Sequence, residues 1–195
     1  HLDDVTLVPQ PLQKPHPPIY MAAYQSAVNV EAAADRRLPI LVGVILDHED
    51  AAKWYPQYDE YAAARGFTVD SSEWPFQRAV FVAETEREAQ EIPREGTMWM
   101  WSMIPYLRSI DGRSDVHEDF NEWRRTNGAE VTYEQSLEKK AIFGTPDTVA
   151  AKIKWLRDTH NIHHFIGDFS AGALDQSKVL RSMELFAEKV MPQLK

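Results

Sequence analysis

L-P-I-L-V-G-V-I-L, residues 38–46, is a nearly unbroken apolar run in a chain of 195 residues. The run is rich in β-branched side chains, and it lacks the alternation of apolar and polar residues that marks a strand with one face in water. Strands that are buried on both faces are typical of parallel sheets covered by helices. Residues 38–46 therefore predict a central strand of an α/β fold.

Strand and helix patterns alternate on both sides of this run. The predicted strands are residues 19–23, 38–46, 76–83 and 163–166. Helical patterns follow at 27–36, at 47–65, after Thr85, after Thr145 and from Leu174 onward. This order predicts four βα units around a parallel sheet.

Capping residues mark several helix starts. Thr85 precedes a first turn with acidic residues, and Thr145 precedes a proline at the first helical position. We expect the last helix to stop at Pro192 and to bury one face, made of Val179, Met183, Phe186 and Val190.

Composition restricts the class of partner. The chain has 21 basic and 30 acidic residues, and its net charge of -9 repels nucleic acid and anionic membrane surfaces. No stretch approaches the roughly twenty apolar residues of a membrane span, so we expect a soluble protein with the cytoplasm as its compartment. The absence of cysteine excludes disulfides, thiolate metal sites and a cysteine nucleophile. A small molecule or a protein remains as the partner.

Four βα units make half of an eight-stranded barrel, whose typical length is about 250 residues. We therefore expect residues 1–195 to form a single domain, a partial (α/β)8 barrel. An open doubly wound sheet is the alternative that the pattern leaves. A half barrel would have unpaired strand edges and an open apolar interior, so we expect a larger parent protein, a complementary N-terminal half or a homo-oligomer.

In a barrel the active site lies at the carboxyl ends of the strands. Ser26 stands there at a helix start, where backbone N–H groups and a hydroxyl favour a phosphate, although a serine that only caps its helix is the commoner case. We call the opening of the barrel at the carboxyl ends of the strands its mouth. The residues expected to line the mouth are Tyr24 to Ser26, Asp47-His48, Glu84-Thr85 and Gly167 to Phe169.

Other polar and aromatic clusters have a functional and a structural interpretation. Residues 47–50, Asp-His-Glu-Asp, suggest acid–base or metal chemistry, or simply an acidic helix start. Residues 98–103 are rich in methionine and tryptophan, which suits either a flat apolar ligand or core packing. Arginines near a long polar segment can clamp an anion or lie in solvent: Arg108, Arg113, Arg124 and Arg125.

Histidines gather near the last strand, at His160, His163 and His164. Adjacent strand residues point to opposite faces, which is poor geometry for a shared ion. We therefore predict no metal site.

Residues 8–19, V-P-Q-P-L-Q-K-P-H-P-P-I, hold five prolines that fix an extended approach to the first strand. Several later pieces follow in a fixed order. They are Ala22-Ala23 with Ser26, Ala33-Ala34 with Leu38-Pro39, Val82-Ala83-x-Thr85-x-x-Glu88-Ala89, Gly144-Thr145-Pro146-Asp147-x-Val149 and the segment from Arg181 to Pro192. Together they make the chain similar to the luciferase-like, flavin-dependent monooxygenases.

The resemblance implies an (α/β)8 barrel that takes reduced FMN from a separate flavin reductase and inserts one oxygen atom of O2 into a small organic substrate. Residues 19–23 would be strand five, so the chain would be the C-terminal half, strands five to eight. Gln25, Ser26 and Asn29 would stand at the flavin-phosphate position. The family's usual catalytic histidine belongs to the first four strands, so no catalytic residue is assigned here.

The resemblance also places a mobile loop insertion at residues 109–140, where the family shields its flavin from water. Arg37 stands where the family commonly has glycine, so the turn there must avoid a left-handed backbone or be strained. Two alternatives stay open, which are a deazaflavin-dependent oxidoreductase of the same fold and a non-catalytic half-barrel interaction module.

Overall fold

Five parallel strands form one sheet in the computed structural model, which describes residues 6, 8–23, 26–110, 120–170, 172 and 174–195. β1, β2 and β3 are neighbours in that order, β5 pairs with the first part of β3, and β4 pairs with its last part. The strands are β1 (Met21–Ala23), β2 (Ile40–Val42), β3 (Phe76–Val82), β4 (Ile142–Gly144) and β5 (Phe165–Asp168). The predicted α/β class with parallel strands is confirmed.

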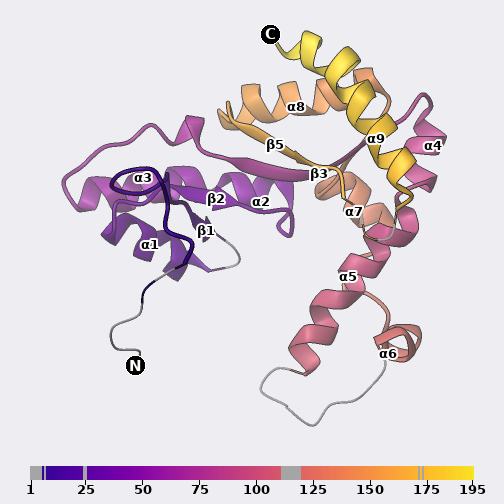
Figure 1. Ribbon diagram of the computed structural model, residues 1–195, viewed down its shortest axis with the longest axis horizontal. Helices are drawn as coiled ribbons and strands as arrows, with labels where there is room; N and C mark the ends of the chain where they lie inside the picture. The colour runs from indigo at the N-terminus through magenta and orange to yellow at the C-terminus, as the bar shows by residue number, and fades with distance from the viewer. Residues whose placement is uncertain (1–5, 7, 24–25, 111–119, 171, 173) are drawn as a thin grey trace.

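Helices follow the strands in the predicted order (Figure 1). The expected helix over residues 47–65 is divided in two, and two further helices lie within residues 109–140, where the sequence predicts a loop. The helices are α1 (Ala27–Asp35), α2 (His48–Ala52), α3 (Trp54–Ala64), α4 (Glu86–Glu91), α5 (Arg94–Ser109), α6 (Phe120–Asn127), α7 (Tyr133–Lys139), α8 (Pro146–His160) and α9 (Gln176–Leu185), with short turns η1 (Ser71–Glu73), η2 (Phe186–Val190) and η3 (Met191–Leu194). In Figure 1, α5 runs away from the sheet and α6 lies beside its far end. None of the described helices has the length and apolar character that a membrane span requires.

The two faces of the sheet are covered differently. Successive side chains of a strand point to opposite faces of the sheet, so the burial of neighbouring residues shows how each face is covered. Ile40, Val42 and Phe76 are fully buried on the face that the helices cover, which we call the outer face. Leu41 and Gln77 are only half-buried on the opposite, inner face. At β2 and the start of β3, the described residues therefore bury only the outer face. Farther along, Phe81 of β3 and Ala83 just after it have the inner-face parity and are buried in a second, smaller hydrophobic cluster.

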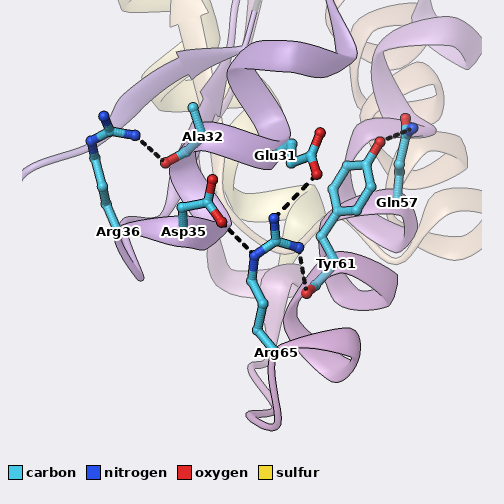
Figure 2. Close-up of polar contacts among 7 residues, drawn as sticks. All are labelled: Glu31, Ala32, Asp35, Arg36, Gln57, Tyr61 and Arg65. Atoms are coloured by element: carbon cyan, nitrogen blue, oxygen red, sulfur yellow. Dashed lines mark hydrogen bonds and ion pairs between the residues drawn. The ribbon is translucent and has the colours of Figure 1, made fainter.

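Arg65 joins the first two long helices of the outer layer (Figure 2). From the end of α3 its guanidinium donates to Asp35 at 2.6 Å and to Glu31 at 3.2 Å, both on α1. It also donates to the carbonyl of Tyr61 at 3.1 Å. The carboxylates are about half-exposed, so this network orients α1 against α3 without adding much stability.

Arg37 adopts the left-handed conformation, with φ of 54°. Its N–H and that of Leu38 donate to carbonyls in the last turn of α1, which is the hydrogen-bond pattern of a Schellman cap. Gly66 ends α3 in the same way with φ of 77°. Of the two possibilities expected for the turn at Arg37, the chain therefore adopts the strained, left-handed backbone. The Arg37 guanidinium lies 5.1 Å from the centre of the Phe67 ring.

The predicted buried face of the last helix is wrong in part. Met183 is 46% exposed, whereas Ser182 and Leu185 are buried, and the Ser182 hydroxyl accepts a hydrogen bond from the N–H of Val82 at 2.7 Å. The helical path also continues through the wider turn η2 and through Pro192 in η3. A wider turn shifts the phase of the side chains, which a constant period of 3.6 residues does not describe.

Candidate functional site

A cavity of about 330 Å³ lies on the inner face, between the end of β2 and α5. The segment after β2 contributes one wall, and Gln77 contributes a polar group from β3. Its lining residues are Gly43, Val44, Ile45, Gln77, Trp99, Met100, Met103 and Ile104. The cavity stands beside the carboxyl end of β2, and α/β barrels bind their ligands at the carboxyl ends of their strands.

The methionine and tryptophan cluster divides between a cavity wall and the packed interior, and its contact with a flat ligand stays a prediction. Trp99, Met100 and Met103 line the cavity. Trp101 is only 4% exposed and belongs to the packed interior, where its indole N–H donates to the hydroxyl of Ser136 at 3.0 Å. Three side chains of one helix thus offer a flat, adaptable apolar wall.

Asp168 at the end of β5 is fixed by three hydrogen bonds. It accepts from the side-chain amide of Gln77 at 3.3 Å, and from the N–H and hydroxyl of Ser170 at 3.0 and 2.7 Å. Asp168 also lines a second cavity of about 20 Å³, next to the first, with the buried Thr97. The Thr97 hydroxyl has no hydrogen-bond partner among the described residues, and this volume has room for one water molecule.

Ser26 caps α1, as the structural interpretation of its position predicts. Its backbone is extended, with φ of -133° and ψ of 126°, and its hydroxyl accepts from the N–H of Val28 at 3.2 Å. Ser26 and Asn29 are both exposed, at the carboxyl end of β1. The other predicted residues of this position, Tyr24 and Gln25, lie outside the described residues.

Asp47 and Lys140 form an ion pair of 2.5 Å beside the cavities. The Lys140 ammonium also donates to the carbonyl of Ile45 at 2.7 Å and lies 5.2 Å from the centre of the Trp101 ring. Residues 47–50 therefore act here as a helix start whose aspartate anchors a lysine from a segment far along the chain.

His48 and Arg78 are buried together under the outer face, at 2% and 0% exposure. Arg78 Nε donates to His48 Nδ1 at 3.1 Å, so the neutral imidazole carries its proton on Nε2. Burial, and then the charge of Arg78, lower the pKa of His48 to about 3. His48 is therefore neutral at physiological pH, and its ring serves as an acceptor for a buried cation.

The expected mouth forms at only some of its predicted positions. Glu84 pairs with Arg181 at 2.6 Å, on α9, and Thr85 caps α4. β3 extends past the cavities to pair with β4, so its last residues lie beyond the mouth. Glu84 and Thr85 were expected to be the β3 residues that line the mouth. The structure has Ala79, earlier in β3, in the lining of the smaller cavity instead.

The predicted histidine and arginine clusters are separate groups in the structure. His163 contacts the side chain of Asn161, and no group of three metal-binding side chains occurs among the described residues. Arg108 pairs with Glu130 at 3.0 Å and Arg124 with Glu95 at 3.1 Å. Arg125 is exposed, and Arg113 lies outside the described residues.

Sequence reasoning did not single out Gln77, Arg78, Thr97 or Lys140. The pair Gln-Arg inside the apolar run of residues 76–83 is the signal for the first two, since polar residues in a buried strand need partners. Lys140 gives no such signal, because its partners Ile45 and Asp47 are more than ninety residues away in the chain.

Comparisons with known proteins agree with this geometry. A family model described as luciferase-like monooxygenase matches residues 1–160. The alkanal monooxygenase alpha chain of a Kryptophanaron alfredi symbiont is 26% identical over 189 residues, which cover 91% of this chain and 52% of that protein. The same protein from Photobacterium leiognathi is 23% identical, with 98% and 56% covered. The chain thus spans about half the length of the curated relatives it matches.

Solved structures show the same fold. The oxygenating constituent of 3,6-diketocamphane monooxygenase from Pseudomonas putida, in complex with FMN, has a TM-score of 0.66 at 22% identity, covering 92% of this chain and 50% of that chain. Coenzyme F420-dependent tetrahydromethanopterin reductase from Methanopyrus kandleri has a TM-score of 0.59 at 21% identity, covering 91% and 51%. The predicted fold, the C-terminal half of an (α/β)8 barrel, is confirmed, with β1, β2, β3 and β5 as strands five to eight.

Proposed function

The chain belongs to the luciferase-like monooxygenase family, and we propose on this basis that it supplies the strand-five to strand-eight side of an FMN-dependent monooxygenase site. The observation that carries the proposal is the cavity of about 330 Å³ beside the carboxyl end of β2 and the first half of β3. An apolar wall faces a polar amide there, which suits a planar ring system with a polar edge.

The residues present fit such a ring. A Cβ built on Gly43 would meet no atom within 4 Å, so the backbone just after β2 leaves open space where the ligand would lie. Trp99, Met100 and Met103 supply polarisable surface on the other side. Gln77, held by Asp168, presents an amide that can donate and accept at the ring's polar edge.

We propose that Gln25, Ser26 and Asn29 bind the flavin phosphate. In support, Ser26 stands at the start of a helix of nine residues with no acidic residue in its first turn. The positive end of a helix dipole and the exposed hydroxyl both favour an anion.

When bound, reduced FMN would supply the electrons that activate O2, so that one oxygen atom enters a small organic substrate and the other leaves as water. The protein's task is to bind, orient and exclude water. We propose that residues 109–140 cover the site; the structure describes α6, α7 and their neighbours in this range, whereas residues 111–119 lie outside the described residues. We also propose that a separate reductase supplies the reduced flavin.

Titration with FMN, followed by flavin fluorescence, tests the site. Met103→Asp places a charge in the apolar wall and is expected to weaken FMN binding about tenfold or more. Leu107→Asp, one turn along α5 at a residue that is 54% exposed, is the matched control and should leave affinity unchanged. Equal affinity in both variants would remove the cavity from the proposal.

A deazaflavin is the second candidate cofactor, because the F420-dependent reductase shares the fold at a TM-score of 0.59. Oxygen uptake separates the two. Consumption of O2 with reduced FMN and a flavin reductase supports a monooxygenase. Hydride transfer from a reduced deazaflavin without O2 uptake supports an oxidoreductase, and flavin binding without either reaction supports a non-catalytic module.

A further inference from the structure

The segment that leaves β2, residues 43–47, is held from two sides by cationic side chains. On one side, Arg78 Nη1 donates to the carbonyl of Gly43 at 2.7 Å. On the other, Lys140 Nζ donates to the carbonyl of Ile45 at 2.7 Å and pairs with Asp47 at 2.5 Å. This explains why β2 ends at Val42 although the apolar run continues to residue 46, since these carbonyls bond to side chains instead of a neighbouring strand.

Among the residues that the structure describes, no carboxylate forms an ion pair with the buried Arg78. Burial lowers the pKa of Arg78, and the Asp47 charge that opposes this shift acts from a distance. Its guanidinium contacts the carbonyls of Gly43 and Gln77, His48 Nδ1 and the ring of Phe76, whose centre is 3.8 Å away. A buried charge costs free energy unless it is paired, and apolar residues of similar size are often as stabilising. Stability alone therefore does not account for an arginine here, whereas a fixed Gly43 carbonyl does.

The segment held in this way forms part of the proposed cofactor cavity. Gly43, Val44 and Ile45 line the cavity of about 330 Å³, and Val44 also lines the smaller one. Arg78 lies under the outer face and lines neither cavity. Its effect on a ligand must therefore pass through the backbone carbonyls that it binds, at Gly43 and at Gln77.

We propose that Arg78 and Lys140 are positioning residues that hold residues 43–47 in the shape that receives the ligand, Arg78 from beneath the sheet and Lys140 from the rim. This proposal rests on the proposed function for the identity of the ligand, FMN. The contacts of Arg78 and Lys140 with residues 43–47, which we call the hold on this segment, are present without any ligand.

Amide hydrogen exchange without flavin tests the hold. In Arg78→Met and in Lys140→Met, exchange at residues 43–47 is expected to be about tenfold faster or more, while the core strand β3 keeps its protection. Lys139→Met, an exposed neighbour, is the matched control and should change nothing. Lys140→Arg, which keeps a donor, should restore slow exchange. Unchanged exchange in both methionine variants would overturn the proposal.

FMN titration of the same variants tests the consequence. Affinity should fall about tenfold in Arg78→Met and Lys140→Met and stay unchanged in Lys139→Met. Should Arg78→Met fail to fold, Lys140→Met decides, because Lys140 lies nearer the surface with its side chain 13% exposed. Absence of FMN binding by the unaltered chain would contradict the proposed function, while the exchange result would still decide the hold.

Discussion

On the outer face of the sheet Ile40, Val42 and Phe76 are fully buried under helices, whereas on the inner face Leu41 and Gln77 are half-buried, and Gln77 borders a cavity. The outer face carries the packing that stabilises the fold. The inner face carries polar and aromatic groups whose geometry suits a ligand. Alternate residues of the same strands thus serve stability and binding. Substitution of one residue at a time can therefore change stability and ligand affinity separately.

The largest effect is expected from a pair of adjacent residues in β2. Ile40→Ala removes a fully buried side chain and should lower the free energy of unfolding by about 3 kcal/mol. Leu41→Ala, on the half-buried inner face, should lower it by about 1 kcal/mol or less. Chemical denaturation measures both, and equal losses would contradict the division between the faces.

Acid should destabilise the outer layer through His48. The pKa of His48 is about 3 in the folded chain against 6.5 for an ordinary histidine, so the unfolded chain binds the proton more readily. As the pH is lowered from 6.5 to about 3, the free energy of unfolding should therefore decrease. This group contributes a decrease of about 1.4 kcal/mol per pH unit.

Denaturation at pH 7, 5.5 and 4.5 measures this slope. His48→Gln keeps an acceptor for Arg78 Nε and does not titrate, so it should remove that part of the slope. An identical slope in the variant would show that His48 is not the group responsible.

Ser26→Asp tests the proposed phosphate contact of Ser26 without disturbing the fold. Aspartate caps helices as well as serine does, but its charge should repel a phosphate and weaken FMN binding about tenfold. Thr85→Asp makes the same change at the cap of α4, away from the cavities, and should leave FMN affinity as it is. Unchanged affinity in Ser26→Asp would remove Ser26 from the site.

The smallest effect is expected at the surface of the outer layer. Arg65→Met breaks the contacts with Glu31 and Asp35 that Figure 2 shows, and these carboxylates are about half-exposed. Thermal unfolding should shift by about 2 °C or less, and added salt should produce a similar shift in the unaltered chain. A much larger shift would mean that this network, and not the buried residues, holds α1 on α3.

Local signals account for what the sequence predicts well. Thr85 and Thr145 cap the helices they were expected to cap, and Gly66 ends α3 in a left-handed conformation. Each of these depends on residues within one turn of the chain. The order of strands and helices follows from the same kind of signal.

Long-range contacts account for what the sequence does not predict. The run of residues 38–46 is apolar throughout, yet β2 ends at Val42 because Arg78 and Lys140 bind the carbonyls of the next residues. β4 was missed, since its three residues give too short a pattern. Ser26 appears as the predicted cap, and its role toward a phosphate stays a prediction.

Hydrogen exchange with and without FMN tests most directly whether the inner face holds the flavin. Addition of FMN should slow exchange at residues 43–45 and 99–104, which contribute the two walls of the cavity, and leave α3 unchanged. The account is contradicted if exchange at both walls stays the same at about 1 mM FMN. It is equally contradicted if slowing is confined to the cavity of about 470 Å³ lined by Glu49, Tyr55 and His160.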